Sequence, residues 1–258
     1  MLEGKTIVIT GVGSGLGREV ALQALKDGAN AVIGARTAEQ LEAIAREADP
    51  SGQRIAAVPT DITDPDACAR IVAEAEQRFG AVHGLVQVAA YEYAMGGLYD
   101  TDFEAWRKSF DTNVIGTLSL VREAATAMKR ASGGSIVLIG SQSMYLPLIE
   151  QMGYAASKGA LLSSMFYLAK ELGPAGIRVN TVVPSWMWGP PVELYLKFQA
   201  KARGLTPEAL RAEIEQGIPL GEMAADEDVA QAVAFFLSDR SRRITGQTLL
   251  VNGGELMR

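Results

Sequence analysis

Cysteine and histidine are almost absent from the 258-residue sequence, which contains one of each. The single cysteine, Cys68, excludes an intramolecular disulfide and indicates a reducing compartment. The single histidine, His83, excludes a metal site built from several histidines, and any Ser-His-Asp triad would have to use it. Because His83 directly precedes the apolar run 84–90, we interpret it as a structural residue at the start of a strand rather than as a catalytic base.

Concentrated positive charge is missing as well. The chain has 24 Lys and Arg against 30 Asp and Glu, a formal net charge of −6, and no basic cluster. Nucleic acid is therefore not an expected partner, since phosphate binding needs a basic face. No apolar run approaches the roughly 18 residues of a membrane span, and the start MLEGKTIVIT lacks the features of a signal peptide. We expect a cytoplasmic protein that does not act in a membrane.

Short apolar runs rich in Val and Ile alternate with amphipathic helical stretches along the whole chain. The runs are almost continuously apolar, which is typical of strands covered on both faces. The alternation predicts an α/β fold in one domain over 1–258, with a doubly wound parallel sheet of about seven strands and helices on both faces. The expected strands are residues 5–10, 31–35, 55–60, 84–90, 135–141, 178–184 and 247–252.

Capping residues mark several helix boundaries, and one connection is unusually long. Gly28 is expected to end the first helix, Asp64 before Pro65 to begin another, and Asp226 to precede the last. Roughly forty residues separate the strand that ends at Pro184 from this last helix, too many for a plain connection. Residues 189–204 and 206–217 are each expected to form a short helix. An insertion of this kind, at about 185–220, is where an α/β protein forms its ligand pocket.

A glycine-rich turn, TGVGSGLG at 10–17, lies between the first expected strand and the first expected helix. Glycines allow the chain to turn sharply and let a pyrophosphate approach the backbone, and the N–H groups at the helix start then face the phosphates. Such a turn alone can be merely tight, but its place between strand and helix favours dinucleotide binding. The expected cofactor-binding residues of the turn are Gly11, Ser14, Gly15, Leu16 and Gly17.

The end of the second strand bears on the choice of cofactor. Sites that prefer NAD usually carry an acidic residue there to bind the ribose 2′-hydroxyl, whereas this chain has Ala35 followed by Arg36. A guanidinium can bind a 2′-phosphate through two charge-assisted hydrogen bonds. The alternative is a solvated surface arginine, and Arg18 is a weaker second candidate. We predict NADP(H) as the cofactor, with NAD as the alternative.

Four residues form a candidate catalytic group. Tyr154 and Lys158 are four apart, which places them on one face of a helix, and a nearby ammonium lowers the pKa of a phenol from about 10. This spacing alone is common in surface pairs. Ser141, at the carboxyl end of the fifth expected strand, could hold a substrate's carbonyl oxygen. Asn113 is an amide in an apolar helical stretch, where a structural hydrogen bond is an equal alternative.

Together these motifs resemble the short, single-domain branch of the short-chain dehydrogenase/reductase family over essentially the whole chain. The match rests on the turn 10–17, Asp61-Ile62 after the third strand, Asn113, Ser141, Tyr154 with Lys158, and the closing ITGQTLLVNGG. The resemblance implies a Rossmann-like fold in which one domain binds the dinucleotide and catalyses the reaction. It also implies an oxidoreductase that interconverts a ketone or aldehyde and its alcohol by hydride transfer, assembled as a homotetramer or homodimer.

The resemblance further implies a role for each matching residue. Tyr154 would be the general acid in reduction and the general base in oxidation, and Lys158 would lower its pKa and bind the nicotinamide ribose. Ser141 would orient the substrate carbonyl, and Asn113 would anchor a water that links Lys158 to solvent. Further cofactor contacts are implied for Asp61, Ile62, Val88, Ala89, Pro184 and Met187.

The chain departs from the family pattern in two places. Asn-Asn-Ala-Gly after the fourth strand is replaced by residues 87–90, Gln-Val-Ala-Ala, so we expect the asparagine hydrogen bonds to be lost and Gln87 to replace only part of them. After the sixth strand the usual Pro-Gly is Pro184-Ser185, and a frequent threonine is Gly189. Cofactor contacts in this second region are therefore left open.

Aromatic, Met and Leu side chains gather in and after the segment 185–191 and on other loops that the expected fold brings to the same edge of the sheet. They are Trp186, Trp188, Leu194, Tyr195, Phe198, Met144, Tyr145, Leu146, Tyr91, Tyr93 and Met95. They indicate either a lid on the protein's own core, an oligomer contact, or a sizeable apolar substrate pocket, and we favour the pocket.

Two other classes of function are a dinucleotide-binding module without activity and a subunit that acts by assembly. The presence of all four candidate catalytic residues favours an enzyme.

Overall fold

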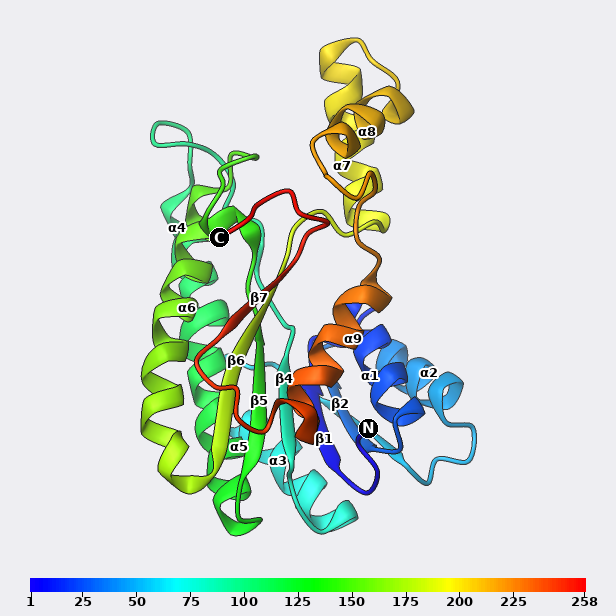
Figure 1. Ribbon diagram of the computed structural model, residues 1–258, viewed down its shortest axis with the longest axis vertical. Helices are drawn as coiled ribbons and strands as arrows, with labels where there is room; N and C mark the ends of the chain where they lie inside the picture. The colour runs from blue at the N-terminus through cyan, green and yellow to red at the C-terminus, as the bar shows by residue number, and fades with distance from the viewer.

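The computed structural model describes residues 1–258, which form a seven-stranded parallel sheet in the order β3-β2-β1-β4-β5-β6-β7 (Figure 1). The strands are β1 Thr6–Thr10, β2 Asn30–Ala35, β3 Ile55–Pro59, β4 Gly84–Gln87, β5 Gly134–Ile139, β6 Ile177–Pro184 and β7 Thr248–Val251. The expected doubly wound α/β fold is confirmed. The strand order reverses between β1 and β4, and ligands of such sheets bind at the carboxyl edge beside this reversal.

Helices cover both faces of the sheet (Figure 1). One face carries α1 Leu16–Lys26, α2 Ala38–Ala48 and α9 Asp226–Leu237, and the other carries α3 Pro65–Phe79, α5 Thr117–Arg130 and α6 Met152–Leu172. The remaining α-helices are α4 Phe103–Phe110, α7 Pro190–Arg203 and α8 Pro207–Gln216. A π-helical segment, Asp111–Gly116, joins α4 to α5.

Alternate residues of each central strand supply two separate cores. In β1, Ile7 and Ile9 pack under α1, α2 and α9, whereas Val8 packs under α3, α5 and α6. All five residues of β1 are buried. This two-sided burial explains why the strands read as continuous apolar runs in the sequence.

Two expected strands extend too far. β4 ends at Gln87 instead of residue 90, because the amides of Val88 and Ala89 both turn back to the carbonyl of Thr10, at 3.0 and 3.2 Å. β5 ends at Ile139, so Ser141 is not part of the strand; it begins the short 3-10 turn Gln142–Met144. Apolar residues continue past β4 as Val88, Ala89 and Ala90, and past β5 the Gly140 amide still bonds to the Val182 carbonyl at 2.8 Å before the chain turns at Ser141.

The expected helix boundaries agree with the structure in most cases. Gly28 follows α1 with φ +94°, a conformation that favours glycine, and the Asp64 side chain accepts a hydrogen bond from the Asp66 amide at 2.9 Å. Asp226 is the first residue of α9 rather than the residue before it. The structural interpretation of His83 is confirmed, because its Nδ1 accepts a hydrogen bond from the Thr6 amide at 3.0 Å.

The long connection between β6 and α9 contains the two expected helices, α7 and α8, which project beyond the carboxyl edge of the sheet as an arm (Figure 1). A backbone bridge between Met187 and Ala224 fixes the base of the arm. The arm has a small core of its own, made of Leu196, Ala200 and Leu210 with Trp188, Val192, Tyr195 and Ile214 against them. None of the helices in the protein combines the length and the apolar character that a membrane crossing requires.

Candidate active site

The carboxyl edge of the sheet brings the four candidate catalytic residues together from three segments. Tyr154 and Lys158 lie one turn apart on α6, and the Lys158 ammonium is 5.6 Å from the centre of the Tyr154 ring. Lys158 is buried, and its Nζ donates a hydrogen bond to the Ile139 carbonyl at 2.7 Å, at the last residue of β5. The prediction that the two side chains share one face of a helix is confirmed.

Ser141 lies at the turn after β5 and takes part in two contacts. Its Oγ accepts a hydrogen bond from the Ser143 amide at 3.3 Å and lies 2.9 Å from the Ser143 hydroxyl. A side-chain hydrogen bond also links Ser141 to Tyr154. The Ser141 hydroxyl therefore reaches the phenol although the residue lies beyond the end of the strand.

The charge states of Tyr154 and Lys158 follow mainly from burial. Burial raises the pKa of Tyr154 above its ordinary value, the charge of Glu92 raises it further, and the hydrogen bond with Ser141 opposes the rise. Burial lowers the pKa of Lys158 to about 8, and the charge of Glu92 opposes that fall. Lys158 is not among the causes of this rise, so the implied lowering of the Tyr154 pKa by Lys158 stays a prediction.

Asn113 acts as a structural clamp. Its Oδ1 accepts a hydrogen bond from the Tyr91 amide at 2.7 Å, and its Nδ2 donates to the Tyr91 carbonyl at 3.0 Å and to Ser157 Oγ at 2.9 Å. The Ser157 hydroxyl in turn donates to the Tyr154 carbonyl at 2.7 Å. The structural alternative for Asn113 is thus confirmed: it fixes the segment after β4 to the first turns of α6, and no hydrogen bond joins it to Lys158. Its role as a water anchor stays a prediction.

Two glycines make the glycine-rich turn possible. Gly11 has φ +81°, and a Cβ on it would lie 2.2 Å from the Ala89 amide nitrogen. A Cβ on Gly17 would lie 2.3 Å from the Gly11 carbonyl oxygen. No larger residue fits either position without a shift of backbone, so the turn, the start of α1 and the segment after β4 pack directly on one another.

The start of α1 fits a pyrophosphate. Its first residue is the buried Leu16, and Gly15 before it provides no side-chain cap for the N–H groups of the first turn. Ser14 is exposed, and a Cβ on Gly13 would meet nothing within 4 Å. Uncapped amides at a helix N-terminus are the donor set that a phosphate requires, and here they lie near Asp226, whose Oδ2 would be 3.3 Å from a Cβ on Gly15.

Arg36 and Asp61 lie at the carboxyl ends of neighbouring strands, where a dinucleotide's adenosine would lie. Arg36 is exposed and has no ion pair, and its charge is one of the causes that lower the pKa of Asp61, after the hydrogen bonds from Thr63. Arg18, in contrast, forms ion pairs with Glu19 and Glu47. Arg36 is therefore the free guanidinium of the two.

Ile62 and Pro184, two other residues implied to contact the cofactor, are both buried, as is Gln87. Ile62 is buried in the core, and its carbonyl oxygen lies beside the buried Gly116 and accepts a hydrogen bond from the Cys68 thiol at 3.4 Å. Gln87 is buried, and its Nε2 donates to the Ala89 carbonyl at 3.0 Å and to Thr117 Oγ1 at 2.7 Å. The second of these bonds ties this segment to α5, and the partial replacement of the family's asparagine bonds by Gln87 stays a prediction. Pro184 is buried at the end of β6.

The two tryptophans of the segment 185–191 have different surroundings. Trp186 lies beside Tyr195, with ring centres 5.4 Å apart, and lines a hollow of about 60 Å³ next to Ser141. Trp188 packs in the core of the arm, with the Arg211 guanidinium 3.8 Å from its ring centre. Trp188 therefore belongs to the core of the arm, whereas a substrate pocket beside Trp186 stays a prediction. The hollow is lined by Ser141, Gln142, Ser143, Leu146, Leu148, Ile149, Gln151, Ser185 and Trp186.

Sequence reasoning missed three residues of this site. Glu92 changes the pKa of both Tyr154 and Lys158, and Gln142 is joined by a hydrogen bond to Glu255, 113 residues away. Glu92, two residues after the segment 87–90, is visible in the sequence as a nearby carboxylate, but nothing local indicates the pairing of Gln142 with Glu255.

Known proteins resemble the chain over nearly its full length. The family model described as enoyl-(acyl carrier protein) reductase matches residues 11–255. An L-rhamnose 1-dehydrogenase (NAD(P)(+)) of Sphingomonas sp. (strain SKA58) is 32% identical over 256 residues, covering 98% of this chain and 97% of that protein. A 3-oxoacyl-(acyl-carrier-protein) reductase of Staphylococcus aureus (strain Mu50) is 30% identical over 254 residues, covering 98% of each.

Solved structures agree in fold. A short-chain type dehydrogenase/reductase from Mycobacterium ulcerans superposes with a TM-score of 0.89 at 32% identity, covering 98% of this chain and 90% of that one. A variant of actinorhodin polyketide ketoreductase, in a structure with NADPH, superposes with a TM-score of 0.90 at 26% identity, covering 99% of each chain.

Proposed function

The chain belongs to the short-chain dehydrogenase/reductase family, and we propose that it is an NADP(H)-dependent enzyme that interconverts a ketone or aldehyde and its alcohol. The observation that carries the proposal is the contact of Tyr154 with Ser141 and Lys158 at the carboxyl edge of the sheet. The same edge carries the glycine-rich turn, so a dinucleotide held at the start of α1 would extend toward Tyr154. We further propose that residues 1–258 form one domain in which the insertion at about 185–220 binds the substrate.

The residues of the glycine-rich turn fit the pyrophosphate of the cofactor, and Arg36 supports the choice of NADP(H). Arg36 has no ion pair, and no acidic residue ends β2. The L-rhamnose relative is named for both NAD and NADP, so the preference rests on Arg36 and not on the relatives. When bound, the nicotinamide supplies or accepts the hydride.

The chain's own residues handle the proton. Because burial raises the pKa of Tyr154, its phenol is protonated at neutral pH and serves as the proton donor to the carbonyl oxygen in reduction. The Ser141 hydroxyl orients that oxygen beside the phenol, and the Lys158 ammonium holds a ribose hydroxyl. In oxidation Tyr154 must first lose its proton, so we expect oxidation to accelerate as the pH rises toward about 8, the pKa of Lys158, above which the ammonium loses its charge.

The substrate proposal follows from the hollow beside Ser141. At about 60 Å³ it is well below the roughly 300–1,000 Å³ of a typical ligand pocket, so it holds only the reacting end of a substrate. Trp186, Leu146 and Leu148 form its apolar side. We propose a sizeable substrate whose apolar part lies outside the hollow, against the base of the arm. One relative is named for L-rhamnose and another for a 3-oxoacyl-(acyl-carrier-protein), so the relatives do not choose between substrates.

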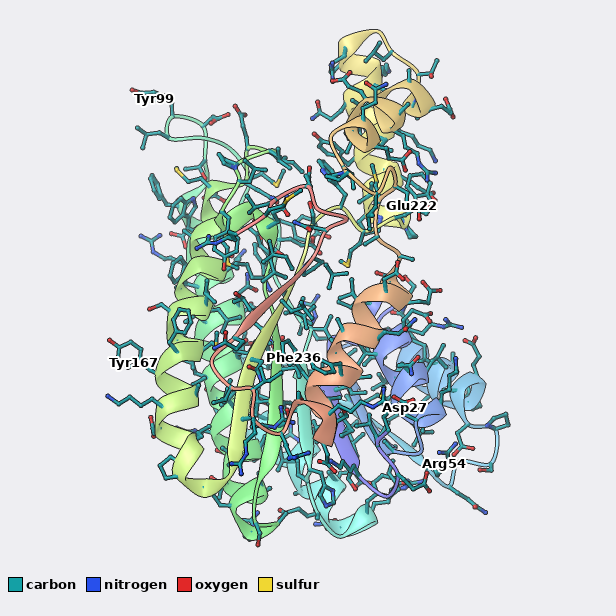
Figure 2. The ribbon with its side chains drawn as sticks, viewed as in Figure 1. Asp27, Arg54, Tyr99, Tyr167, Glu222 and Phe236 are labelled. Atoms are coloured by element: carbon teal, nitrogen blue, oxygen red, sulfur yellow. The ribbon has the colours of Figure 1, made fainter.

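We also propose that the protein assembles with copies of itself and is located in the cytoplasm. Phe166 and Tyr167 of α6 are 51% and 75% exposed, and Figure 2 shows Tyr167 pointing away from the sheet. Apolar side chains of this size on an outer helix support contact with a second copy, as a homodimer or homotetramer. The lone buried Cys68 supports a cytoplasmic location.

Binding of NADPH and NADH tests the proposal first, followed by NADPH consumption with ketones and aldehydes of increasing size. We expect tight NADPH binding and turnover. Substitution Arg36→Ala should weaken NADPH binding about 10- to 100-fold, because a charge-assisted bidentate contact is lost, and leave NADH binding unchanged. The matched control is Arg46→Ala, an exposed arginine on α2 that pairs only with Glu42. Equal losses for both nucleotides would remove the assigned role of Arg36.

A further inference from the structure

The last seven residues of the chain, 252–258, cross the carboxyl edge of the sheet and end beside the turn that follows β5 (Figure 1). We call them the C-terminal segment. The Arg258 guanidinium lies 3.9 Å from the centre of the Tyr145 ring, which belongs to that turn region. Asn252 fixes the shape of the segment, because its Oδ1 accepts from the Gly254 amide and its Nδ2 donates to the Leu256 carbonyl, both at 3.0 Å.

Glu255 in this segment joins two walls of the active site. Its Oε2 accepts a hydrogen bond from Gln142 Nε2 at 2.7 Å and another from Ser185 Oγ. Gln142 and Ser185 both line the hollow that contains Ser141. A single carboxylate therefore links the turn after β5 to the segment after β6.

Gln142 depends on the C-terminal segment for both ends of its carboxamide. Its Nε2 donates to Glu255, and its Oε1 accepts from Asn252 Nδ2 at 2.6 Å. The residue is only 1% exposed, so water cannot readily replace these partners, and an unpaired buried amide is strongly unfavourable. The position of Gln142 is thus set by residues more than one hundred positions away.

Gln142 is also the residue bonded directly to Ser141. The Ser141 hydroxyl caps the same turn through the Ser143 amide, so a displacement of Gln142 moves the Ser141 hydroxyl away from Tyr154. We propose that Glu255 is a positioning residue for the reaction: it holds Ser141 in place through Gln142 and fixes the opposite wall through Ser185. The inference rests on the proposed function, since it assigns a task to Glu255 only if Ser141 orients a substrate.

Kinetics of NADPH-dependent reduction test the proposal with Glu255→Ala, Glu255→Gln, Gln142→Ala and the Glu255→Ala/Gln142→Ala double variant. We expect Glu255→Ala to lower kcat/KM roughly 10- to 100-fold, mainly through kcat, because a small misplacement of a reacting group has an effect of this size. NADPH affinity should stay within about twofold, since the segment does not touch the glycine-rich turn. Glu255→Gln keeps one acceptor oxygen and should lie between wild type and Glu255→Ala.

The double variant separates positioning from a general structural effect. If Glu255 acts through Gln142, the two losses overlap, and the double variant should be less than about threefold worse than Gln142→Ala alone. Glu76→Gln is the matched control, because Glu76 also accepts two hydrogen bonds, from Arg130 on the outer surface, at 2.9 and 2.7 Å. It should leave kcat and KM unchanged.

The role of Glu255 and the proposed function would be overturned by different results. Wild-type kinetics in the Glu255→Ala and Glu255→Gln variants, or losses that multiply in the double variant, would overturn the role of Glu255 and leave the proposed function standing. A wild-type protein that binds neither nucleotide and reduces no carbonyl would overturn the proposed function, and the role of Glu255 with it.

Discussion

The two ends of the active site are held in place by different physical means. At the nucleotide end, Gly11 packs against the Ala89 backbone and Gly17 against the Gly11 backbone, and neither glycine has room for a side chain beyond hydrogen. At the substrate end, side chains hold the chain in place: Leu210 packs within the arm, and Glu255 bonds to Gln142, 113 residues away. The difference indicates that the nucleotide end tolerates little variation, whereas the substrate end can change one side chain at a time. Such a division allows one fold to serve many substrates.

The largest expected effect lies at the nucleotide end. Gly11→Ala places a Cβ 2.2 Å from the Ala89 amide nitrogen in a backbone conformation with φ +81°, so the turn or the segment after β4 must shift. We expect a loss of about 3 kcal/mol or more in the free energy of unfolding and loss of NADPH binding. Denaturant unfolding and fluorescence titration measure the two. Gly13→Ala, which meets nothing within 4 Å, is the control and should change little.

A smaller and more local effect is expected in the arm. Leu210 is 3% exposed and is one of only three buried apolar residues of the arm's core. Leu210→Ala should destabilise the arm by roughly 2–3 kcal/mol and raise KM for the carbonyl substrate, while NADPH affinity stays unchanged. Leu205→Ala, an exposed leucine between α7 and α8, serves as the control. Weaker NADPH binding in Leu210→Ala would show that the two ends are not independent.

The smallest effect concerns pH. The charge of Glu92 raises the pKa of Tyr154 and also that of Lys158, so Glu92→Gln should lower both. Oxidation requires deprotonated Tyr154 and charged Lys158, so both limbs of the pH profile of kcat/KM should move to lower pH. Glu150→Gln removes a charge that affects neither group and should leave the profile in place. A shift of either limb to higher pH would contradict the assignment of Tyr154 and Lys158.

The sequence predicts the nucleotide end well, because that end depends on local patterns. The apolar runs locate the seven strands, the turn 10–17 identifies itself by its glycines, and Tyr154 and Lys158 share a helix face because they are four residues apart. Strand ends are less accurate: Ser141 falls two residues beyond β5, because it caps the 3-10 turn that follows the strand.

The substrate end could not be predicted to the same degree. Nothing in the local sequence distinguishes Trp186, which lines the hollow, from Trp188, which packs inside the arm. The pairing of Gln142 with Glu255 depends on the three-dimensional course of the chain after β7 and has no spacing signature. The upward shift of the Tyr154 pKa also required the structure, because burial is its main cause.

The central claim is that the Tyr154 hydroxyl transfers the proton, whereas the affinity for the cofactor comes from other residues, such as those of the glycine-rich turn. The most direct measurement compares wild type with Tyr154→Phe in two assays, NADPH binding by tryptophan fluorescence and NADPH consumption with the best carbonyl substrate. We predict that NADPH affinity stays within about twofold while kcat falls by roughly a hundredfold to ten-thousandfold, since Phe keeps the ring and removes the proton donor. A variant that retains most of the wild-type kcat would contradict the account.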